Sequence, residues 1–545
     1  MKERSPAWEP VAVGLILLAA MALRLVGLRW GLPDQYHYFS YHPDEAPILQ
    51  PALRMVGGDW NPHFFNYGTL YLYMVAFFTT SFVGLGLLHS DPNSIWPAMH
   101  IIARVLTALM GVGTVAAVYF IARRMLALPW SLIAAALMAV APMHALHSHF
   151  ATVDVPATFF LSLAVLALVV LADEAHLAYY ILAGALIGLA AATKYTMALA
   201  VLPLLVIHFV AKPTRFKYAP PIWYLALAAG CAVVAFSVAC PHAFARDGSS
   251  LRLNPEFVRD VSFEMRHMRQ GGTFAFINTG SGWGYHLLRS LPCGLGIPFL
   301  VGALVGIGAL VRLASPGALA ALVWSVPYFL LIGTAQERFL RYTIPLAPFA
   351  AIAAAALLAV IAGVEKPTTR RIAWAAVLAV ALVASTAWYC AANVAVLART
   401  DPRDAAGDFL RQRIERASLG LASEPWYFTP GVVPYNGGLR SRSAFERWRE
   451  KQAHFRIVIT GWNARALTSS RPRFYAISDM EYADPLRLGM KGAQQLMQAL
   501  KQHYRDETDF ENEPAAIILG RAKAASPPDW LYARPRIAVF SGWRR

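Results

Sequence analysis

The chain has 545 residues, of which 57% are hydrophobic and only 15% are charged, and its mean hydropathy is +0.44. Soluble proteins average about 25% charged residues, so this composition excludes an entirely soluble chain. The apolar runs lie within residues 11–396, whereas residues 397–545 have an ordinary soluble composition. We therefore predict a polytopic α-helical membrane domain at 1–396 and a small soluble domain at 397–545.

The net charge is +16, and half of it lies in residues 397–545. A basic surface beside a membrane favours anionic lipid or polysaccharide as a partner. Nucleic acid is not expected as a partner of a chain anchored in this way. The four cysteines all fall in apolar segments, which favours small core residues over disulfides or a metal site. They are Cys231, Cys240, Cys293 and Cys390.

The first apolar run, residues 11–28, has the length of a signal peptide or of a retained anchor. We interpret it as an anchor, because Arg24 and Arg29 follow its core and no clean cleavage site comes next. With it, about eleven crossings of roughly 17–25 residues are expected. They are 11–28, 101–121, 131–147, 156–171, 178–192, 197–211, 222–240, 291–311, 318–334, 344–363 and 373–395.

Basic residues predict the orientation, because loops rich in Lys and Arg stay on the cytoplasmic side. With Lys2 and Arg4 inside, this odd number of crossings places the basic loops inside and the C-terminal domain outside. The clusters in these loops are Arg123 and Arg124; Lys212, Arg215 and Lys217; Arg312; and Lys366, Arg370 and Arg371.

One further apolar run, Thr69 to Leu88, is also long enough to cross the membrane. A crossing there would move Arg123 and Arg124 to the outside. We therefore predict a helix that lies in the outer interface, within the first outer loop.

This topology brings polar residues of separate loops to the outer face. Ionisable groups near the bilayer cost about 2.5–3.5 kcal/mol each, so they usually mark a functional path or site. Convergence on one face is typical of a membrane enzyme or of a transporter vestibule. The residues are His42, Asp44, Glu45, His147, His149, Asp154, Lys194, His242, Glu264, His267, Glu337, Arg338 and Arg341.

The stretch His42-Pro43-Asp44-Glu45 lies in the first outer loop. One carboxylate can act as a general base toward an attacking hydroxyl, while its neighbour orients it or binds a cation. The alternative is a capping role at the helix that begins near Ala46, because acidic residues favour helix N-termini.

Two other groups of residues are compatible with a metal site. His147 and His149 with a nearby Asp154 can bind a metal, or Asp154 can simply cap the helix in which Pro156 follows it. Glu264 and His267 share one face of a predicted amphipathic helix at 254–270. This pair can complete a divalent cation site with the first loop, or it can be an ordinary surface pair.

Glu337, Arg338 and Arg341 precede a helix that Pro345 opens. Guanidinium forks match phosphate oxygens, so the two arginines predict a phosphate clamp at membrane level, to which Lys194 adds a charge. Generic contact with phospholipid headgroups is the alternative. The chain has no Walker A loop, G-x-G-x-x-G after a strand, G-x-S-x-G or C-x-x-C. A transferase of this kind would therefore use a lipid-borne donor.

The order of these motifs resembles the GT-C superfamily of integral membrane glycosyltransferases, most closely the protein O-mannosyltransferases and aminoarabinose transferases. The resemblance covers roughly residues 10–365. It rests on His42 to Glu45, Arg104 at the second crossing, Thr152 to Pro156, Thr193 to Thr196, and Glu337 to Tyr342.

In that superfamily the donor is a polyprenyl-phosphate sugar, and the sugar passes with inversion to a hydroxyl outside the cytoplasm. The resemblance implies that Asp44 is the catalytic base and Glu45 its neighbour. Arg338, Arg341 and Lys194 would hold the lipid phosphate. The substrate-binding candidates are His42, Arg104, His149, Asp154, Glu264, His267 and Glu337.

The expected fold is thus a GT-C-like polytopic helical membrane protein with an interfacial helix, followed by a small soluble α/β domain. In the soluble part we predict helices at 404–416 and 492–504 and strands at 455–460, 515–519 and 537–540.

The expected function is transfer of a sugar from undecaprenyl phosphate in a bacterial inner membrane, with the site and the C-terminal domain periplasmic. The acceptor would be an envelope glycan, a lipid or a protein. A secondary transporter or lipid flippase is the main alternative, although the chain has no internal repeat and its polar residues do not gather at mid-membrane. An envelope scaffold with a decayed site is least favoured.

Overall fold

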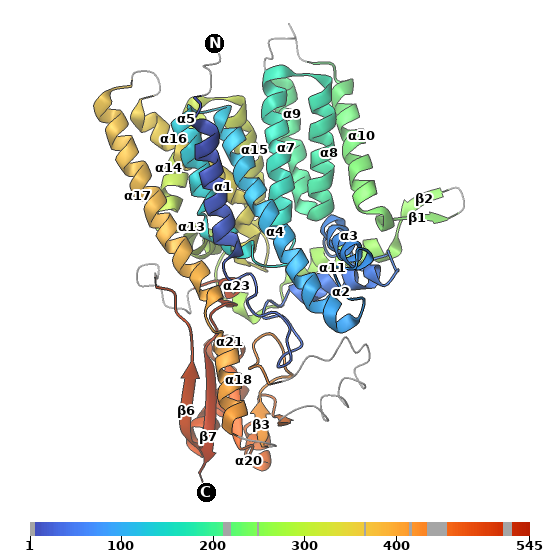
Figure 1. Cartoon of the computed structure of the whole chain (residues 1–545), viewed down its shortest axis with the longest axis vertical. Coiled ribbons are helices and arrows are strands. Elements are labelled where there is room, and N and C mark those ends of the chain that lie inside the picture. Colours follow the sequence, from blue (N-terminus) through green and yellow to red (C-terminus); the bar gives the residue numbers. More distant parts are fainter. Residues whose placement is uncertain are drawn as a thin grey trace.

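A bundle of helices and a smaller domain with strands make up the computed structural model (Figure 1). The structure describes residues 6–210, 220–247, 250–363, 367–413, 417–432, 455–515 and 526–544. The described N-terminal residues lie at one end of the bundle, and the smaller domain lies at the other.

Apolar helices form the bundle, because uniformly apolar sequences satisfy their backbone groups internally only as helices. Its long helices are α1 (Glu9–Leu25), α4 (Pro92–Arg123), α5 (Leu128–Ala139), α7 (Asp154–Glu174), α8 (Leu177–Thr193), α9 (Val201–Val210), α10 (Trp223–Ala239), α14 (Ile297–Leu313), α15 (Pro316–Gly333), α16 (Ala347–Ala362) and α17 (Thr369–Val394). Of the helices in the described ranges, 5 are long and apolar enough to cross a membrane, or 6 if one bent pair is a single span. The predicted count of about eleven crossings therefore stays a prediction.

Further elements connect the apolar helices. They are α6 (Pro142–His147), η1 (Tyr195–Ala200), η2 (Pro241–Ala243), β1 (Phe244–Asp247), β2 (Ser250–Leu253), α11 (Pro255–Gln270), η3 (Phe274–Phe276), α12 (Gly282–Tyr285), η4 (His286–Ser290), α13 (Leu291–Leu295), η5 (Leu340–Leu346) and η6 (Ala395–Ala398). The amphipathic helix predicted at 254–270 is α11, and the side chain of Asn254 caps it by accepting from the amide of Glu256.

The first outer loop contains α2 (Glu45–Val56) and α3 (Leu70–Gly84). Both lie near the end of the bundle that faces the smaller domain, and Figure 1 shows α3 nearly end-on beside the upright helices. This arrangement agrees with a helix lying across the bundle, while its place in the membrane interface stays a prediction.

The predicted span 291–311 is not one straight helix. The segment Gly282–Leu295 meets Ile297–Leu313 at an angle of 119°. Gly296, between them, has a φ of +82°, a backbone conformation that costs glycine little and other residues more. The bend turns η4 and α13 away from α14, toward the end of the bundle where the candidate site lies.

Two glycines bring α8 and α10 into close contact. Gly184 and Gly188 are four residues apart and therefore lie on one face of α8. A Cβ at Gly184 would lie 2.1 Å from the carbonyl oxygen of Ala228, and one at Gly188 would lie 2.3 Å from that of Ala232. This is the small-residue packing common between membrane helices.

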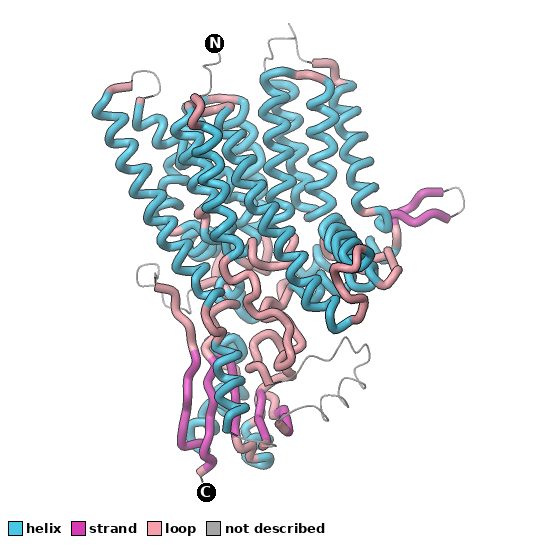
Figure 2. Tube along the Cα trace, viewed as in Figure 1, coloured by secondary structure: helices cyan, strands magenta, loops and turns pink. Residues whose placement is uncertain are grey.

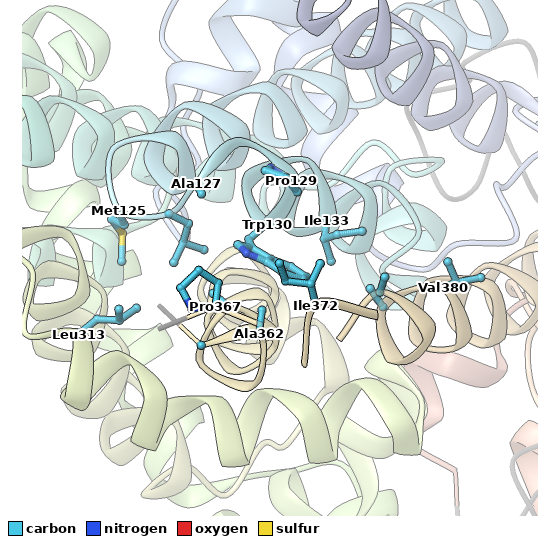
Figure 3. Close-up of a pocket in the computed structure, with 15 residues that line it drawn as sticks. Met125, Ala127, Pro129, Trp130, Ile133, Leu313, Ala362, Pro367, Ile372 and Val380 are labelled. Carbon is cyan, nitrogen blue, oxygen red and sulfur yellow. The ribbon is translucent and has the colours of Figure 1, made fainter. Parts of the chain in front are cut away.

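Three of the predicted basic loops meet at one end of the bundle. An apolar hollow of 490 Å³ between α5, α14, α16 and α17 is lined by Met125, Leu313 and Pro367, among others (Figure 3). Each of these residues follows or precedes one of the predicted basic clusters in the sequence. Glu9 at the start of α1 lies 3.5 Å from Arg123, so the N-terminus is at the same end. Lys212, Arg215, Lys217 and Lys366 lie outside the described residues.

The smaller domain is built on a five-stranded sheet of order β4-β3-β5-β7-β6 (Figure 2). β3 pairs in parallel with β4 and β5, and β7 pairs antiparallel with β5 and β6. The elements are α18 (Pro402–Arg413), β3 (Ser418–Leu421), β4 (Arg456–Ile459), α20 (Ala464–Ser470), β5 (Phe474–Ser478), α21 (Asp479–Arg487), α22 (Lys491–His503), β6 (Tyr504–Phe510), α23 (Pro528–Leu531) and β7 (Ile537–Trp543).

The helices predicted at 404–416 and 492–504 correspond to α18 and α22, and two predicted strands correspond to β4 and β7. The strand predicted at 515–519 lies almost entirely outside the described residues. Strands β3, β5 and β6 were not predicted. β6, with sequence YRDETDF, is too polar to be recognised as a strand by its hydrophobic pattern.

Candidate functional site

The first outer loop presents Asp44 to an arginine of a distant segment. Oδ2 of Asp44 lies 3.2 Å from Nη2 of Arg341, and 28% of the Asp44 side chain is exposed. Asp44 occupies the N-cap position of α2 but makes no side-chain capping hydrogen bond. The capping interpretation is therefore not supported, and this carboxylate is available for chemistry.

The environment of Asp44 favours a base of raised strength. Burial raises the pKa of Asp44, the positive charge of Arg341 opposes this, and the charges of Asp154 and Glu45 raise the pKa further. A carboxylate with a raised pKa accepts a proton more readily than an ordinary aspartate does.

Glu45 is held in a completely different environment from its neighbour. It is fully buried and binds Arg104 through two hydrogen bonds, of 2.8 Å from Nε and 2.7 Å from Nη2. The amide of Ala151 and the hydroxyl of Ser40 also donate to it. Burial alone would raise the pKa of Glu45, but the pair with Arg104 lowers it to about 2. The structure therefore points to a positioning role for Glu45 rather than to proton transfer.

Arg104 ties this carboxylate to the chain that leaves the first helix. Its Nη1 donates to the carbonyl oxygens of Leu28 and Trp30, at 2.8 and 2.6 Å. The Glu45–Arg104 pair therefore joins α2, α4 and the end of the first apolar segment, and it fixes the loop that carries Asp44.

Asp154 and Lys194 form a second ion pair close to Asp44. Nζ of Lys194 donates to Oδ1 of Asp154 at 2.6 Å, and the ammonium lies 4.9 Å from the centre of the Tyr342 ring. The charge of Asp154 acts on Asp44, so both pairs belong to one site. Since Asp154 already compensates Lys194, the predicted contact of Lys194 with a phosphate stays a prediction.

Two tyrosines that the sequence did not single out lie among these charges. Tyr67 lies between α2 and α3, and the charges of Asp44, Arg341, Glu264 and Asp154 act on its hydroxyl. The charges of Arg341, Glu264 and Asp154, and the hydroxyl of Tyr67, act on the hydroxyl of Tyr342. Tyr342 directly follows Arg341 of the predicted phosphate clamp, and this position could have indicated that it lies in the site. No sequence pattern indicated this for Tyr67.

Arg338 differs from the other two cationic candidates. Its Nη1 donates to the hydroxyl of Thr279 at 2.6 Å, and its Nη2 donates to Gln336 at 3.3 Å. In the described ranges no carboxylate lies within ion-pair distance of it, and only 5% of its surface is exposed. A buried guanidinium without a counter-charge is a suitable binding partner for an anionic group.

An apolar cavity of 350 Å³ lies between α14, α15 and α16. Leu287 and Leu291 line one side of it, and Leu346 and Phe349 line another. The charge of Arg338 acts on the imidazole of His286, which directly precedes Leu287. Other lining residues, such as Val326 and Leu330, are half exposed at the bundle surface. The cavity is therefore open to the surroundings of the bundle, and Arg338 is not among the residues that line it.

The predicted cation site is not assembled in the described part of the chain. There, no group of three or more His, Cys, Asp or Glu side chains is placed to hold a metal ion. Glu337 accepts from the amide and hydroxyl of Thr273, at 3.0 and 2.7 Å, and lies 3.9 Å from His267. Glu264 accepts from Asn66 at 3.3 Å. These contacts anchor α11 and its following loop to the site.

Two of the three histidines predicted to bind substrate, His42 and His149, are buried, and their contacts hold the fold together. Nδ1 of His42 accepts from the amide of Asp44 at 3.3 Å, and burial holds the pKa of His42 well below its usual value. Nε2 of His149 lies 2.9 Å from the carbonyl oxygen of Val26, and Nδ1 lies 2.9 Å from that of Ala145. These contacts favour positioning of the first loop for both residues.

The C-terminal domain contributes residues that sequence reasoning missed. The ring of Tyr532 lies 5.1 Å from that of His42. Asp529 accepts hydrogen bonds from the amides of Leu340 and Arg341, each at 2.9 Å. No motif marked either residue, because both contacts depend on how the tail folds back onto the bundle.

The comparison with family models finds one match. The model described as dolichyl-phosphate-mannose-protein mannosyltransferase matches residues 95–240. This segment contains Arg104, Asp154 and Lys194. No curated protein matches the chain by sequence.

Solved structures share the fold at low sequence identity. The oligosaccharyltransferase of Archaeoglobus fulgidus, tethered to an acceptor peptide with the NVT sequon, has a TM-score of 0.55 at 15% identity, covering 95% of this chain and 74% of that chain. AglB of the same organism, in complex with an inhibitory peptide and a dolichol-phosphate, has a TM-score of 0.54 at 13% identity, covering 96% and 77%. ArnT of Cupriavidus metallidurans in the apo state has a TM-score of 0.48 at 18% identity, covering 97% of each chain. The family match over residues 95–240 and the fold shared with the two archaeal structures confirm the resemblance to the GT-C superfamily.

Proposed function

We propose that this chain, a membrane glycosyltransferase of GT-C type, transfers a sugar from a polyprenyl phosphate to a hydroxyl of a cell-envelope acceptor. The matched family model is that of a dolichyl-phosphate-mannose-dependent enzyme, and the archaeal neighbour was solved with a dolichol-phosphate. Both support a lipid-phosphate donor. For a bacterial inner membrane that donor is undecaprenyl phosphate carrying a sugar, used on the periplasmic side.

Two features of the bundle carry the proposal: the buried guanidinium of Arg338 and an apolar cavity. The lining residue Leu287 directly follows His286, on which the charge of Arg338 acts. A polyprenyl chain needs an apolar groove, and its phosphate needs a cation at the end of that groove. The cavity lined by Leu287 and Leu346 supplies the first, and Arg338, which has no carboxylate partner in the described ranges, supplies the second.

In this proposal the transfer step takes place at Asp44. The carboxylate accepts the proton of the acceptor hydroxyl, whose oxygen attacks the anomeric carbon as the bond from that carbon to the phosphate oxygen breaks. The polyprenyl phosphate leaves as an anion, so no acid is needed for the leaving group. Arg338 and Arg341 stabilise the charge that develops on this phosphate.

The other predicted residues take supporting roles in this proposal. Glu45 and Arg104 fix the loop that carries the base, and Lys194 and Asp154 line the site beside it. Attack from the side opposite the phosphate inverts the anomeric centre.

Binding of undecaprenyl phosphate to the purified protein tests the donor assignment. Arg338→Ala should weaken this binding at least about tenfold, because a hydrogen bond to a charged group contributes roughly 1.5–3 kcal/mol. Arg371→Ala is the matched control, since Arg371 lies at the opposite end of the bundle and donates to the carbonyls of Ile361 and Val360. Unchanged affinity of the Arg338→Ala variant would exclude Arg338 as the phosphate ligand. Failure of the wild-type protein to bind this lipid would remove the main support for a polyprenyl donor.

A further inference from the structure

A short segment of the C-terminal domain is built into the core of the helix bundle. Trp530, Tyr532 and Ala533 are 3%, 6% and 5% exposed, and all three belong to the hydrophobic core formed by the bundle helices. The strands β3, β5 and β7 have separate cores of their own. The segment that begins with α23 is therefore docked into the bundle and does not simply cover it.

Asp529, at the start of this segment, contacts the loop that carries Arg341. It is 1% exposed. Its Oδ1 accepts from the amide of Leu340 and its Oδ2 from the amide of Arg341, each at 2.9 Å. The same Oδ2 lies 3.6 Å from Nη1 of Arg341. One carboxylate thus binds both the backbone and the side chain of that loop.

These contacts replace a missing local cap. Leu340 begins η5, and its N-cap residue, Phe339, makes no side-chain capping hydrogen bond. The first amides of a helical segment lack intrahelical partners, and an acidic side chain satisfies them best. Asp529 performs this task from 188 residues further along the chain.

The other contacts that hold Arg341 in place are made by its guanidinium. Its guanidinium stacks on the ring of Phe339 at 3.8 Å, and Nη2 contacts Asp44 at 3.2 Å. Nη1 makes no hydrogen bond to any described residue. Loss of the Asp529 carboxylate would therefore free the backbone that sets this guanidinium opposite Asp44.

We infer that Asp529 is a positioning residue for the transfer reaction, through which the C-terminal domain holds Arg341 against the base. The inference rests on the proposed function, because it assigns Asp529 a role in that reaction. Through this contact, the C-terminal domain helps to hold the catalytic centre in place.

The test compares Asp529→Asn with Asp529→Glu in the full-length protein. Hydrogen exchange of the Leu340 and Arg341 amides is measured together with kcat and KM for sugar transfer in membrane vesicles that contain the donor lipid. Asp529→Asn should speed exchange of the two amides and lower kcat about tenfold with little change in KM. Asp529→Glu keeps the carboxylate and should restore most of kcat. Asp509→Asn is the control, since Asp509 pairs with Arg536 inside the C-terminal domain.

The two measurements separate the inference from the proposed function. Unchanged amide exchange in Asp529→Asn would overturn the inference even if transfer occurs. Equal kcat in Asp529→Asn and the wild type would also overturn it. If the wild type transfers no sugar, the proposed function is refuted. Faster amide exchange in Asp529→Asn would still establish the contact in that case. A thermal unfolding midpoint in detergent equal to that of the wild type confirms that Asp529→Asn is folded. An unfolded variant transfers the decision to Asp529→Glu, whose loss of kcat would overturn the inference.

Discussion

Two neighbouring carboxylates in the first outer loop have opposite electrostatic environments. Burial raises the pKa of Asp44, whereas Arg104 lowers that of Glu45 to about 2. Pairs of titratable groups whose environments move their pKa values apart are typical of active sites, because each can then take a separate role. We assign proton transfer to Asp44 and positioning to Glu45 on this basis.

The rate of sugar transfer should depend on pH through Asp44. A base is active only when it is unprotonated, and the pKa of Asp44 lies above its usual value of 3.8 because of burial, with Arg341 and Lys194 opposing and Asp154 and Glu45 adding to the shift. The rate should therefore fall on the acid side with a midpoint above pH 3.8. Initial rates in membrane vesicles at a series of pH values measure this limb, and a midpoint at or below pH 3.8 would contradict the assignment.

The buried pair of Glu45 and Arg104 should matter for stability more than any exposed pair. Glu45→Gln leaves a fully buried guanidinium without its counter-charge, which costs about 3–5 kcal/mol. The midpoint of thermal unfolding in detergent should fall clearly. Asp173→Asn, which removes an exposed partner of Arg124, is the control and should change stability by about 0–1 kcal/mol. Equal midpoints of the two variants would refute the structural role.

The same pair predicts a pH window for stability. The pKa of Glu45 is lowered on folding from 4.5 to about 2. Its contribution is therefore complete above pH 4.5 and is lost as the pH falls toward 2. The Glu45→Gln variant should lack this part of the acid sensitivity.

Among the elements, α8 and α10 depend on small residues. A Cβ at Gly188 would lie 2.3 Å from a carbonyl oxygen of α10, so Gly188→Leu should separate the two helices and destabilise the bundle by roughly 1–3 kcal/mol or more. Thermal unfolding in detergent measures the effect. Gly14→Leu in α1, where no atom lies within 4 Å of the added Cβ, is the matched control. A Gly188→Leu variant as stable as this control would contradict the packing.

The sequence allowed several elements to be predicted and others not. Hydrophobic length identified the bundle helices, and amphipathic spacing identified α11. The bend at Gly296 was missed, since a glycine between two apolar runs does not reveal its φ. Strand β6 was missed because five of its seven residues, from Arg505 to Asp509, are polar, and its pairing with β7 decides its structure.

For the whole molecule, the association of the C-terminal domain with the bundle was beyond sequence reasoning. Arg403, fully buried in the C-terminal domain, donates to the carbonyls of Tyr427 and Tyr532 and stacks on the ring of Tyr41 at 3.8 Å. Nε1 of Trp30 donates to Asp401 at 2.8 Å. Contacts between residues more than 350 positions apart leave no pattern in the local sequence. The order of acidic and basic motifs, in contrast, predicted one site with Asp44, Asp154, Lys194 and Arg341. The structure brings Asp44 to Arg341 and Asp154 to Lys194, while their common function stays a prediction.

In the proposed function, the molecule is one catalytic unit, with an apolar cavity for the lipid, Arg338 for its phosphate and a base in the first loop. The proposed transfer reaction depends on Asp44 as its base. Asp59, an exposed acid in the same loop, provides a control for the loss of a charge there.

The most direct test is a lipid and glycan analysis of cells that carry the wild type, Asp44→Asn or Asp59→Asn as their only copy of this protein. With Asp44→Asn we predict that a polyprenyl-phosphate sugar accumulates and that one envelope glycan loses a residue, while Asp59→Asn resembles the wild type. Asp44→Asn protein of wild-type abundance and thermal stability would show that the loss concerns chemistry and not folding. Unchanged donor lipid and unchanged glycans in cells with Asp44→Asn would contradict the central claim that this chain is a transferase with Asp44 as its base.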